Sequence, residues 1–186
     1  MLKFALLVIL TTGNLSAQDV TGTKAFPTDS GVYLKSAQGE WNEIEPEIVN
    51  WKTGGVAKSA FSYGIVKGDM NGHIKGPTSV TRLAVNELLV VVPDGTSVTE
   101  YQLLHLREHS KDREFRAATG GVFHQSGGSD RDAIEFQHKK LASRTYSIEI
   151  PVSIQDGQYG ILPPGAVSSK SATSIGKIYS FKLARQ

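Results

Sequence analysis

The chain has no cysteine among its 186 residues. Without cysteine, no disulfide can close its loops, and no thiolate can serve as a nucleophile or as a metal ligand. Small secreted domains often depend on disulfides because their cores are small, but a chain of this length can bury a sufficient hydrophobic core. We therefore expect its stability to come from packing.

The sequence also lacks an excess of charge of either sign. Its 20 Lys and Arg residues are nearly balanced by 18 Asp and Glu residues. A nucleic-acid-binding protein needs a concentrated positive surface, so this balance argues against a nucleic-acid partner. No segment after the first residues has the apolar length that a membrane span requires, and we expect a mature chain without one.

The N-terminal residues have the pattern of a signal peptide. Lys3 supplies a positive charge, residues 4–10 (FALLVIL) form an apolar run too short to cross a bilayer, and Ala17 is a small residue suited to cleavage. We expect cleavage after Ala17. The mature protein would then begin at Gln18 and be secreted or periplasmic, and soluble.

The apolar residues alternate with polar ones far more often than they recur at helical spacing. The 19 Gly and 7 Pro residues divide the chain into short segments, a rhythm typical of antiparallel sheet. Residues 88–92 are continuously apolar, which predicts a central strand. The Gly-rich region 52–77 carries no assignment. The other predicted strands cover residues 31–35, 40–44, 133–138, 144–150, 158–162 and 177–183.

Two hairpins have a predicted register. In the first, a four-residue loop places Lys35 opposite Glu40 and Leu34 opposite Trp41. The second covers residues 100–116, which also contain good helix formers after a capping-box pattern at residues 97–100. A hairpin is favoured because a turn at residues 109–112 creates two opposite-charge pairs and one apolar pair in a single register. These pairs are Glu108 with Arg113, Arg107 with Glu114, and Leu106 with Phe115.

Residues 154–159 (IQDGQY) combine an apolar residue, a turn at Asp156 and Gly157, and Tyr159 at the start of a strand. This pattern resembles the tyrosine corner of immunoglobulin-like sandwiches, in which the tyrosine hydroxyl bonds to backbone a few residues upstream. The resemblance covers the last third of the chain and implies a fold class without implying a function. It implies that residues 144–150, 158–162 and 177–183 are strands E, F and G.

These patterns together predict an all-β fold, an antiparallel β-sandwich with an immunoglobulin-like Greek key, after a cleaved signal peptide. Residues 1–17 are the signal peptide and residues 18–186 form a single domain. Residues 18–30 are a candidate flexible arm at its N-terminal end.

No motif in the sequence identifies catalytic residues, a cofactor or a metal site. His105 and His109 would suit zinc on a helix, but four residues of a strand span about 13 Å, which keeps the two rings apart. Residues 68–72 (GDMNG) resemble a fragment of a calcium loop, and a tight turn explains them better. The alternating Glu43, Glu45 and Glu47 are expected to be solvated. We expect no metal and no cofactor, and a noncatalytic protein is favoured over an enzyme.

The leading hypothesis for function is a noncatalytic binding or assembly module outside the cytoplasm, with an unknown protein or carbohydrate partner. The alternatives are a secreted or periplasmic hydrolase acting on sugars or peptides, and a structural subunit that assembles through edge strands. If the module binds through a sheet face, the second hairpin presents a candidate site opposite its apolar side. The candidate residues are His105, Arg107, Glu114 and Arg116. A solvated face with cross-strand ion pairs would explain the same four residues.

Overall fold

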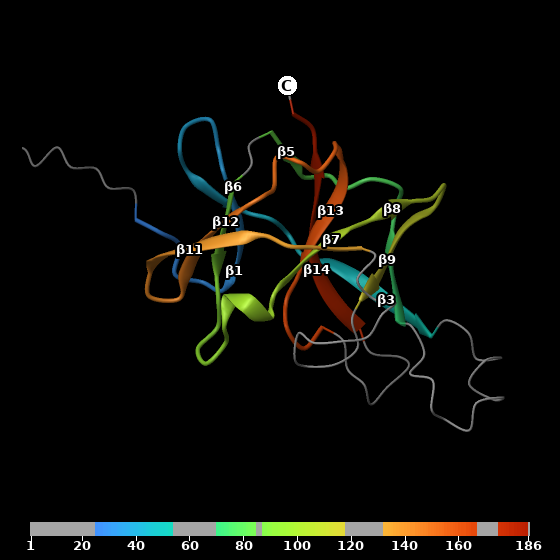
Figure 1. The fold of residues 1–186 in the computed structure, drawn as a ribbon, viewed down its shortest axis with the longest axis horizontal. Coiled ribbons are helices and arrows are strands. Elements are labelled where there is room, and N and C mark those ends of the chain that lie inside the picture. Colours follow the sequence, from blue (N-terminus) through green and yellow to red (C-terminus); the bar gives the residue numbers. More distant parts are fainter. Residues whose placement is uncertain (1–24, 54–69, 85–86, 118–131, 167–174, 186) are drawn as a thin grey trace, which may run out of the picture.

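The computed structural model describes residues 25–53, 70–84, 87–117, 132–166 and 175–185 (Figure 1). The predicted signal peptide and its cleavage site lie outside the described residues, as do residues 18–24 of the predicted arm. In the described part of the chain, the secondary structure consists of β-strands and one short 3-10 turn, η1 (Val98–Glu100). The prediction of an all-β protein with antiparallel sheets is confirmed.

The strands form two sheets. The five-stranded sheet has the order β11 (Gln137–Ala142), β12 (Thr145–Glu149), β6 (Glu87–Val91), β1 (Gly31–Lys35) and β2 (Trp41–Glu43). The nine-stranded sheet has the order β10 (Ala133–Ile134), β7 (Gln102–His105), β13 (Gly157–Leu162), β14 (Ile175–Leu183), β3 (Glu47–Thr53), β4 (Met70–Lys75), β9 (Asp112–Ala117) and β8 (Arg107–Glu108). Its ninth strand, β5 (Arg82–Leu83), pairs in parallel with β14, whereas the other pairs are antiparallel.

The nine-stranded sheet curls into a half-barrel. Its last strand, β8, follows β7 along the chain with only Leu106 between them. The sheet therefore curls back until its last strand lies next to β7, the second strand in its order. Gly72 allows this curvature at β4, because a Cβ atom there would lie 2.3 Å from the Phe115 ring. The interior of the half-barrel is a cluster of buried residues: Val49, Trp51, Ile74, Leu104, Leu106, Phe115, Leu162 and Ile178.

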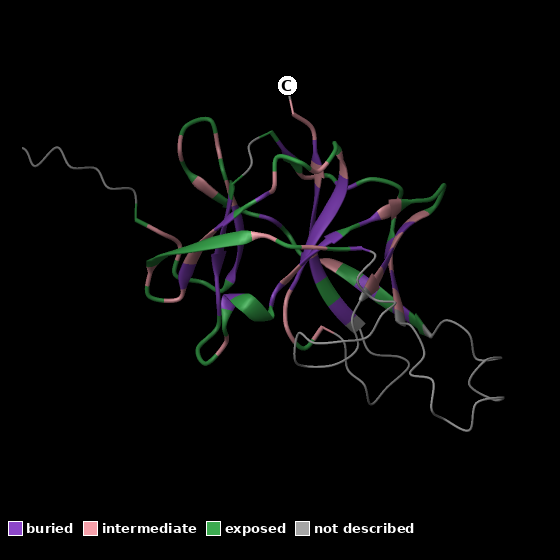
Figure 2. Ribbon diagram, viewed as in Figure 1, coloured by how far each residue is buried: buried purple, intermediate pink, exposed green. Residues whose placement is uncertain are grey.

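A larger apolar cluster joins the two sheets. Val32, Val90 and Ile148 of the five-stranded sheet belong to the same buried cluster as Ile161 and Phe181 of β13 and β14. Figure 2 shows the buried residues along the central strands of both sheets. The inner face of the five-stranded sheet is therefore packed against the outer side of the half-barrel.

The prediction of a central strand at residues 88–92 is confirmed. β6 lies between β12 and β1, and Leu88 and Val90 face the cluster shared by the two sheets. Leu89 and Val91 belong to a third cluster on the opposite face of the same sheet. Burial on both faces explains why this strand is continuously apolar.

The predicted register of the first hairpin is wrong by one residue. Lys35 is opposite Trp41, and Leu34 is opposite Asn42. The loop has five residues rather than four and includes Gly39 at a positive φ of 77°. Because a shift of one residue exchanges the faces, Lys35 places its Nζ 5.4 Å from the centre of the Trp41 ring.

The predicted register of the second hairpin is confirmed at two of its three pairs, but its first strand is shorter than predicted because residues 102–105 form β7 and pair with β10 and β13. Arg107 is opposite Glu114 and Glu108 is opposite Arg113. The capping-box pattern also forms: Ser97 accepts a bond from the Thr99 amide, and Glu100 accepts one from the Ser97 amide, but the turn they cap is η1 rather than a long helix. The capping-box pattern thus belongs to η1, and the charge pattern belongs to the hairpin of β8 and β9 that follows it in the chain.

Three other strand assignments need correction. Residues 133–138 do not form one strand, because β10 pairs with β7 of the half-barrel and β11 pairs with β12 of the other sheet. Strand β3 was not predicted. Strand β4 lies in the unassigned region, and its residues Asn71 and Gly72, expected in a turn, belong to the strand; residues 68–69 lie outside the described residues.

Candidate functional site

The predicted corner at Tyr159 forms the expected hydrogen bond. Its hydroxyl donates to the Gln155 carbonyl at 2.7 Å, and its side chain is buried against the Phe181 ring, with centroids 6.2 Å apart. Asp156 accepts from the Arg185 backbone amide at 3.1 Å, and Arg185 also donates to the Ile154 carbonyl. Tyr159, Asp156 and Gly157 therefore have a structural role at the start of β13.

The predicted binding face is brought together only in part. Arg107 lies 3.6 Å from the carboxylate of its cross-strand neighbour Glu114, which also lies 3.2 Å from Nε2 of His109. Arg107 donates to both oxygens of Asp132, at 2.7 and 2.6 Å. Asp132 is buried and was missed by the sequence prediction because it follows a Gly- and Ser-rich segment with no periodicity.

The other two predicted residues have separate roles. His105 packs its ring against Tyr159, with centroids 5.4 Å apart, and its backbone amide donates to the Asp132 carbonyl. Arg116 donates its backbone amide to the Asp132 carboxylate at 2.8 Å. The carboxylate of Asp132 thus links the Arg107 guanidinium to the Arg116 backbone, whereas the Arg116 Nε is buried with no hydrogen-bond partner among the described residues.

A second polar cluster lies inside the half-barrel. Arg113 is fully buried and donates to Glu47 through both terminal nitrogens, at 2.8 and 3.1 Å. It also donates to Ser180 Oγ at 2.8 Å and to the Gly76 carbonyl at 3.0 Å, and Ser180 bonds to Glu47. Of the three glutamates expected to be solvated, Glu43 and Glu45 are exposed, whereas Glu47 is partly buried and pairs with a buried guanidinium.

Another histidine–carboxylate contact lies on the half-barrel, where His73 Nδ1 is 3.0 Å from Asp112 Oδ2. Within the described ranges, no group of three or more His, Asp or Glu residues is arranged to hold a metal ion. In the same residues, no helix has the length and apolar character needed to cross a membrane.

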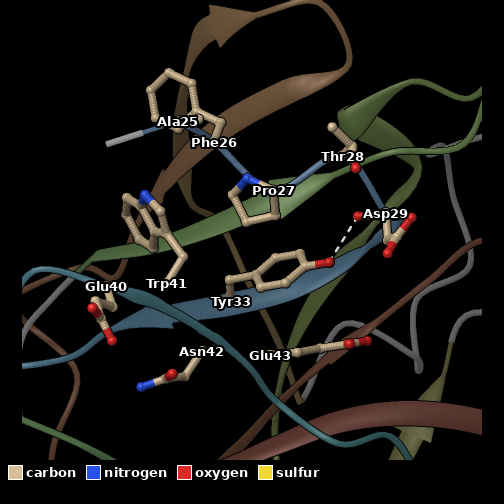
Figure 3. Close-up of a pocket in the computed structure, with 10 residues that line it drawn as sticks. All are labelled: Ala25, Phe26, Pro27, Thr28, Asp29, Tyr33, Glu40, Trp41, Asn42 and Glu43. Atoms are coloured by element: carbon tan, nitrogen blue, oxygen red, sulfur yellow. Dashed lines mark hydrogen bonds between the residues drawn. The ribbon is translucent and has the colours of Figure 1, made fainter. Parts of the chain in front are cut away.

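An open groove lies on the outer face of the five-stranded sheet (Figure 3). It has a volume of about 780 Å³ and runs between residues 25–29 and the hairpin of β1 and β2. Its lining residues are Ala25, Phe26, Pro27, Thr28, Asp29, Tyr33, Glu40, Trp41, Asn42 and Glu43. Residues 25–30 of the predicted arm thus pack onto the sheet instead of extending from it.

Aromatic rings form the apolar part of the groove. The rings of Phe26 and Trp41 are tilted by 39° with centroids 6.5 Å apart, and both are only partly buried. They pack on the buried cluster of Tyr33, Leu89 and Val91. The groove therefore has a rigid apolar wall, because its aromatic rings are supported by the third core cluster.

Tyr33 positions the chain that closes one side of the groove. Its hydroxyl donates to the Asp29 carbonyl at 2.8 Å, four residues upstream, which is the same bond that Tyr159 makes to Gln155. Burial raises the pKa of Tyr33 above its ordinary value, and the nearby carboxylates of Glu43 and Asp29 raise it further. The phenol therefore stays protonated as a hydrogen-bond donor at neutral pH.

Carboxylates give the groove its polar rim. Asp29, Glu40 and Glu43 line it. Figure 3 shows the Glu43 side chain lying along Tyr33, with Asn42 on the opposite side of the same strand segment. Carboxylates are acceptors for ligand hydroxyl or ammonium groups.

Comparison with known proteins adds no function. No family model matches the chain, and searches of curated proteins and of solved structures found no significant match. Sequence reasoning missed the groove because Phe26, Tyr33 and Trp41 share no periodic spacing. One signal was present: Gly31 precedes Tyr33 by two residues, just as Gly157 precedes Tyr159.

Proposed function

We propose that the protein is an exported, noncatalytic module that binds a carbohydrate in the groove lined by Phe26, Tyr33 and Trp41. The observation that carries this proposal is the combination of partly exposed aromatic rings with a rim of carboxylates. Binding sites for small molecules combine apolar and aromatic walls with a few fixed polar groups. Among the features of the described residues, the groove fits this description best.

The two kinds of groups match the two kinds of surface on a sugar. The C–H face of a pyranose ring is apolar and packs on aromatic rings such as those of Trp41 and Phe26. The hydroxyls at the ring edge are donors that the carboxylates of Asp29 and Glu43 can accept. The open groove would admit one or two sugar units of a longer chain rather than enclose a small metabolite.

The proposal includes an immunoglobulin-like sandwich as the framework. The order β1-β6-β12-β11 corresponds to strands A-B-E-D of such a domain, and β7-β13-β14 corresponds to C-F-G. The tyrosine corner at the start of β13, the strand in position F, supports the same assignment. In this framework β2 to β5 and β8 to β10 are insertions, and the groove uses one of them.

Export is supported by the N-terminal pattern and by the choice of ligand. A positive residue, a short apolar run and Ala17 are the elements of a cleaved signal peptide. Polysaccharides that a module of this kind would bind are found outside the cytoplasm. Mass spectrometry of the mature protein should find Gln18 at its N-terminus, and an intact Met1 in the soluble cytoplasm would contradict export.

The two tryptophans of the chain allow a direct test of the groove. Trp41 lines the groove, whereas Trp51 is buried in the half-barrel, where it donates to the Ala166 carbonyl at 2.9 Å. Trp51→Phe leaves Trp41 as the fluorescent reporter, and Trp41→Phe leaves Trp51. Titration with a panel of neutral and amino-sugar oligosaccharides should give a saturable change in emission in the first variant and no change in the second.

Affinity measurements then separate the groove from the rest of the surface. Trp41→Ala should weaken binding about tenfold or more, because a central aromatic contact commonly contributes more than 1 kcal/mol. Val152→Ala is the matched control, since Val152 is an exposed apolar residue that does not line the groove. If no oligosaccharide binds, or if both variants lose affinity equally, the groove is not a carbohydrate site.

A further inference from the structure

Among the described residues, the two outer strands of the five-stranded sheet, β11 and β2, each pair with a neighbour on one side only. The four successive pairs from β11 to β2 are all antiparallel. Five strands that alternate in direction leave the first and the last running the same way. A second copy displaced along the sheet, without rotation, would therefore place its β11 parallel to β2 of the first copy.

The backbone of β2 presents alternate residues to its open side. The Ile44 amide donates to the Val32 carbonyl, which makes this pair a hydrogen-bonded pair of the ladder with β1. In an antiparallel ladder, hydrogen-bonded pairs alternate with pairs whose backbone groups point away. Trp41 and Glu43 therefore direct their amides and carbonyls to the open edge, with their side chains on the outer face where the groove lies.

The same reasoning applies to β11. The Val92 amide donates to the Arg144 carbonyl, so the alternation along β12 directs the backbone of Ser147 toward β11, where it is opposite Lys139. Lys139 thus points its backbone inward, and His138 and Lys140 point theirs to the open edge. The side chains of His138 and Lys140 lie on the inner face, the face opposite to that of Trp41 and Glu43.

This arrangement of faces suits parallel pairing. When strands pair in parallel, the residues whose backbone groups meet have side chains on opposite faces, and an antiparallel pair would require the same face. On β11, the residues whose backbone groups point to the open edge have their side chains on the inner face of the sheet. On β2, the corresponding residues have their side chains on the outer face. A displaced copy thus continues the hydrogen-bond ladder and keeps its inner and outer faces aligned with those of the first copy.

The two edges also carry opposite charge. His138, Lys139 and Lys140 on β11 are exposed, and so are Glu43 and Glu45 at β2. Lysine on an edge strand prevents pairing with apolar or basic strands. The lysines thus restrict the partner of β11 to an acidic edge, and the chain itself supplies one.

We propose that copies of this chain assemble head to tail, with β11 of one copy added in parallel to β2 of the next. Lys139 then lies on the outer face beside Glu43, one residue of the groove rim. Because the two contacting surfaces differ, the contact is heterologous and continues into a ring or a filament. The assembly does not depend on the carbohydrate, since the edge backbone and the charges carry it.

Sedimentation velocity of the purified chain over a range of concentrations tests the proposal. We expect the mean mass to rise with concentration and to fall when salt screens the charges. Lys139→Glu and Glu43→Lys should each weaken association about tenfold or more, because each places like charges at the contact. The double variant K139E/E43K should regain association, since the exchanged charges attract again.

Two controls separate the contact from loss of folding or from general charge effects. Lys177→Glu makes the same charge change on the exposed part of β14 and should leave association unchanged. Circular dichroism and thermal melting should show that each variant is folded. A chain that stays monomeric at every concentration, or single variants that associate like the parent, or a double variant that does not recover would each overturn the proposal.

Discussion

The half-barrel and the five-stranded sheet differ in where they place charged side chains: the half-barrel buries a charged pair, and the five-stranded sheet exposes lysines at its edge. In the half-barrel, Arg113 is fully buried and its guanidinium is held by Glu47, Ser180 and two backbone carbonyls. On the five-stranded sheet, the lysines of β11 are exposed at the edge. A buried charge has to be paired and contributes to a unique interior, whereas a displayed charge is available to a partner.

The two tyrosine corners repeat this difference. Tyr159 and Tyr33 make the same bond to a carbonyl four residues upstream, at 2.7 and 2.8 Å. The turn below Tyr159 is bound by Arg185, which donates to Ile154 and to Asp156. The turn below Tyr33 lines the open groove. Tyr159 holds the turn at the start of β13, whereas Tyr33 holds the turn beside the groove.

The largest effect is expected at the buried charge. Arg113→Ala should lower the free energy of unfolding by about 3–5 kcal/mol, because it leaves the carboxylate of Glu47 without its partner. Lys139→Ala, at the exposed edge, should change it by no more than about 0.5 kcal/mol. Denaturant unfolding of both variants measures the difference. Equal costs would mean that the two regions do not differ in this way.

The apolar cluster between the two regions should make the protein sensitive to alkali. Burial raises the pKa of Tyr101 to about 12, with smaller contributions from Tyr179 and Glu100. The folded state therefore favours the neutral phenol. The stability from this group is complete below about pH 10, the pKa of an unfolded tyrosine, and is lost as the pH rises to about 12.

A rise in the pKa of Tyr101 from 10.0 to about 12 corresponds to about 2.7 kcal/mol of folding stability. Unfolding free energies measured at pH 9 and at pH 11.5 should differ, and Tyr101→Phe should reduce that difference because its side chain cannot ionise. If the variant loses stability with pH as steeply as the parent does, other groups cause the alkaline transition.

At the closed corner, Tyr159→Phe should cost about 1–3 kcal/mol, because it keeps the ring packing but leaves the Gln155 carbonyl without its donor. Tyr146→Phe is a matched control on β12, where the ring is partly exposed. Denaturant unfolding measures both changes in free energy: each follows from the shift in the unfolding midpoint when the dependence of free energy on denaturant concentration is unchanged. A Tyr159 variant as stable as the parent would show that water replaces the bond.

Much of the β-structure followed from local pattern, and the reasons are visible at particular residues. The register of the second hairpin could be predicted because Arg107 with Glu114 and Glu108 with Arg113 all favour the same alignment. The first hairpin has one plausible charge pair, Lys35 with Glu40, and that pair was misleading because Gly39 lengthens the loop.

Strand β4 could not be predicted from its own residues. Asn71 and Gly72 have turn propensity, and their place in a strand depends on the Phe115 ring, which fills the space that a side chain at Gly72 would occupy. Likewise, nothing near Glu47 in sequence indicates that it pairs with Arg113, since β3 and β9 come together only through β4. Contacts between distant segments decide both cases.

The groove lies on a different surface from the face predicted from the sequence, for a related reason. The face of His105, Arg107, Glu114 and Arg116 was identified from hairpin alternation, which correctly places Arg107 beside Glu114. Alternation says nothing of Asp132, which precedes β10 and accepts hydrogen bonds from the Arg107 guanidinium and the Arg116 backbone amide. The groove needs residues 25–29 to pack on a hairpin, and tertiary packing of this kind has no local pattern.

The smaller effect of the two corner variants, and the sharpest test of the comparison between them, is expected for Tyr33→Phe. The acceptor of Tyr33 is the Asp29 carbonyl, which belongs to the exposed turn beside the groove and can be hydrated when the hydroxyl is removed. We expect a stability loss of about 0.5–1 kcal/mol, the net value of an ordinary hydrogen bond and less than the loss at Tyr159. Oligosaccharide affinity should fall more clearly than stability, because residues 25–29 would no longer be held against the sheet. Denaturant unfolding and ligand titration of Tyr33→Phe and Tyr159→Phe, measured side by side, give the comparison. If Tyr33→Phe costs as much stability as Tyr159→Phe and leaves affinity unchanged, both corners serve the fold alone and the groove does not depend on Tyr33.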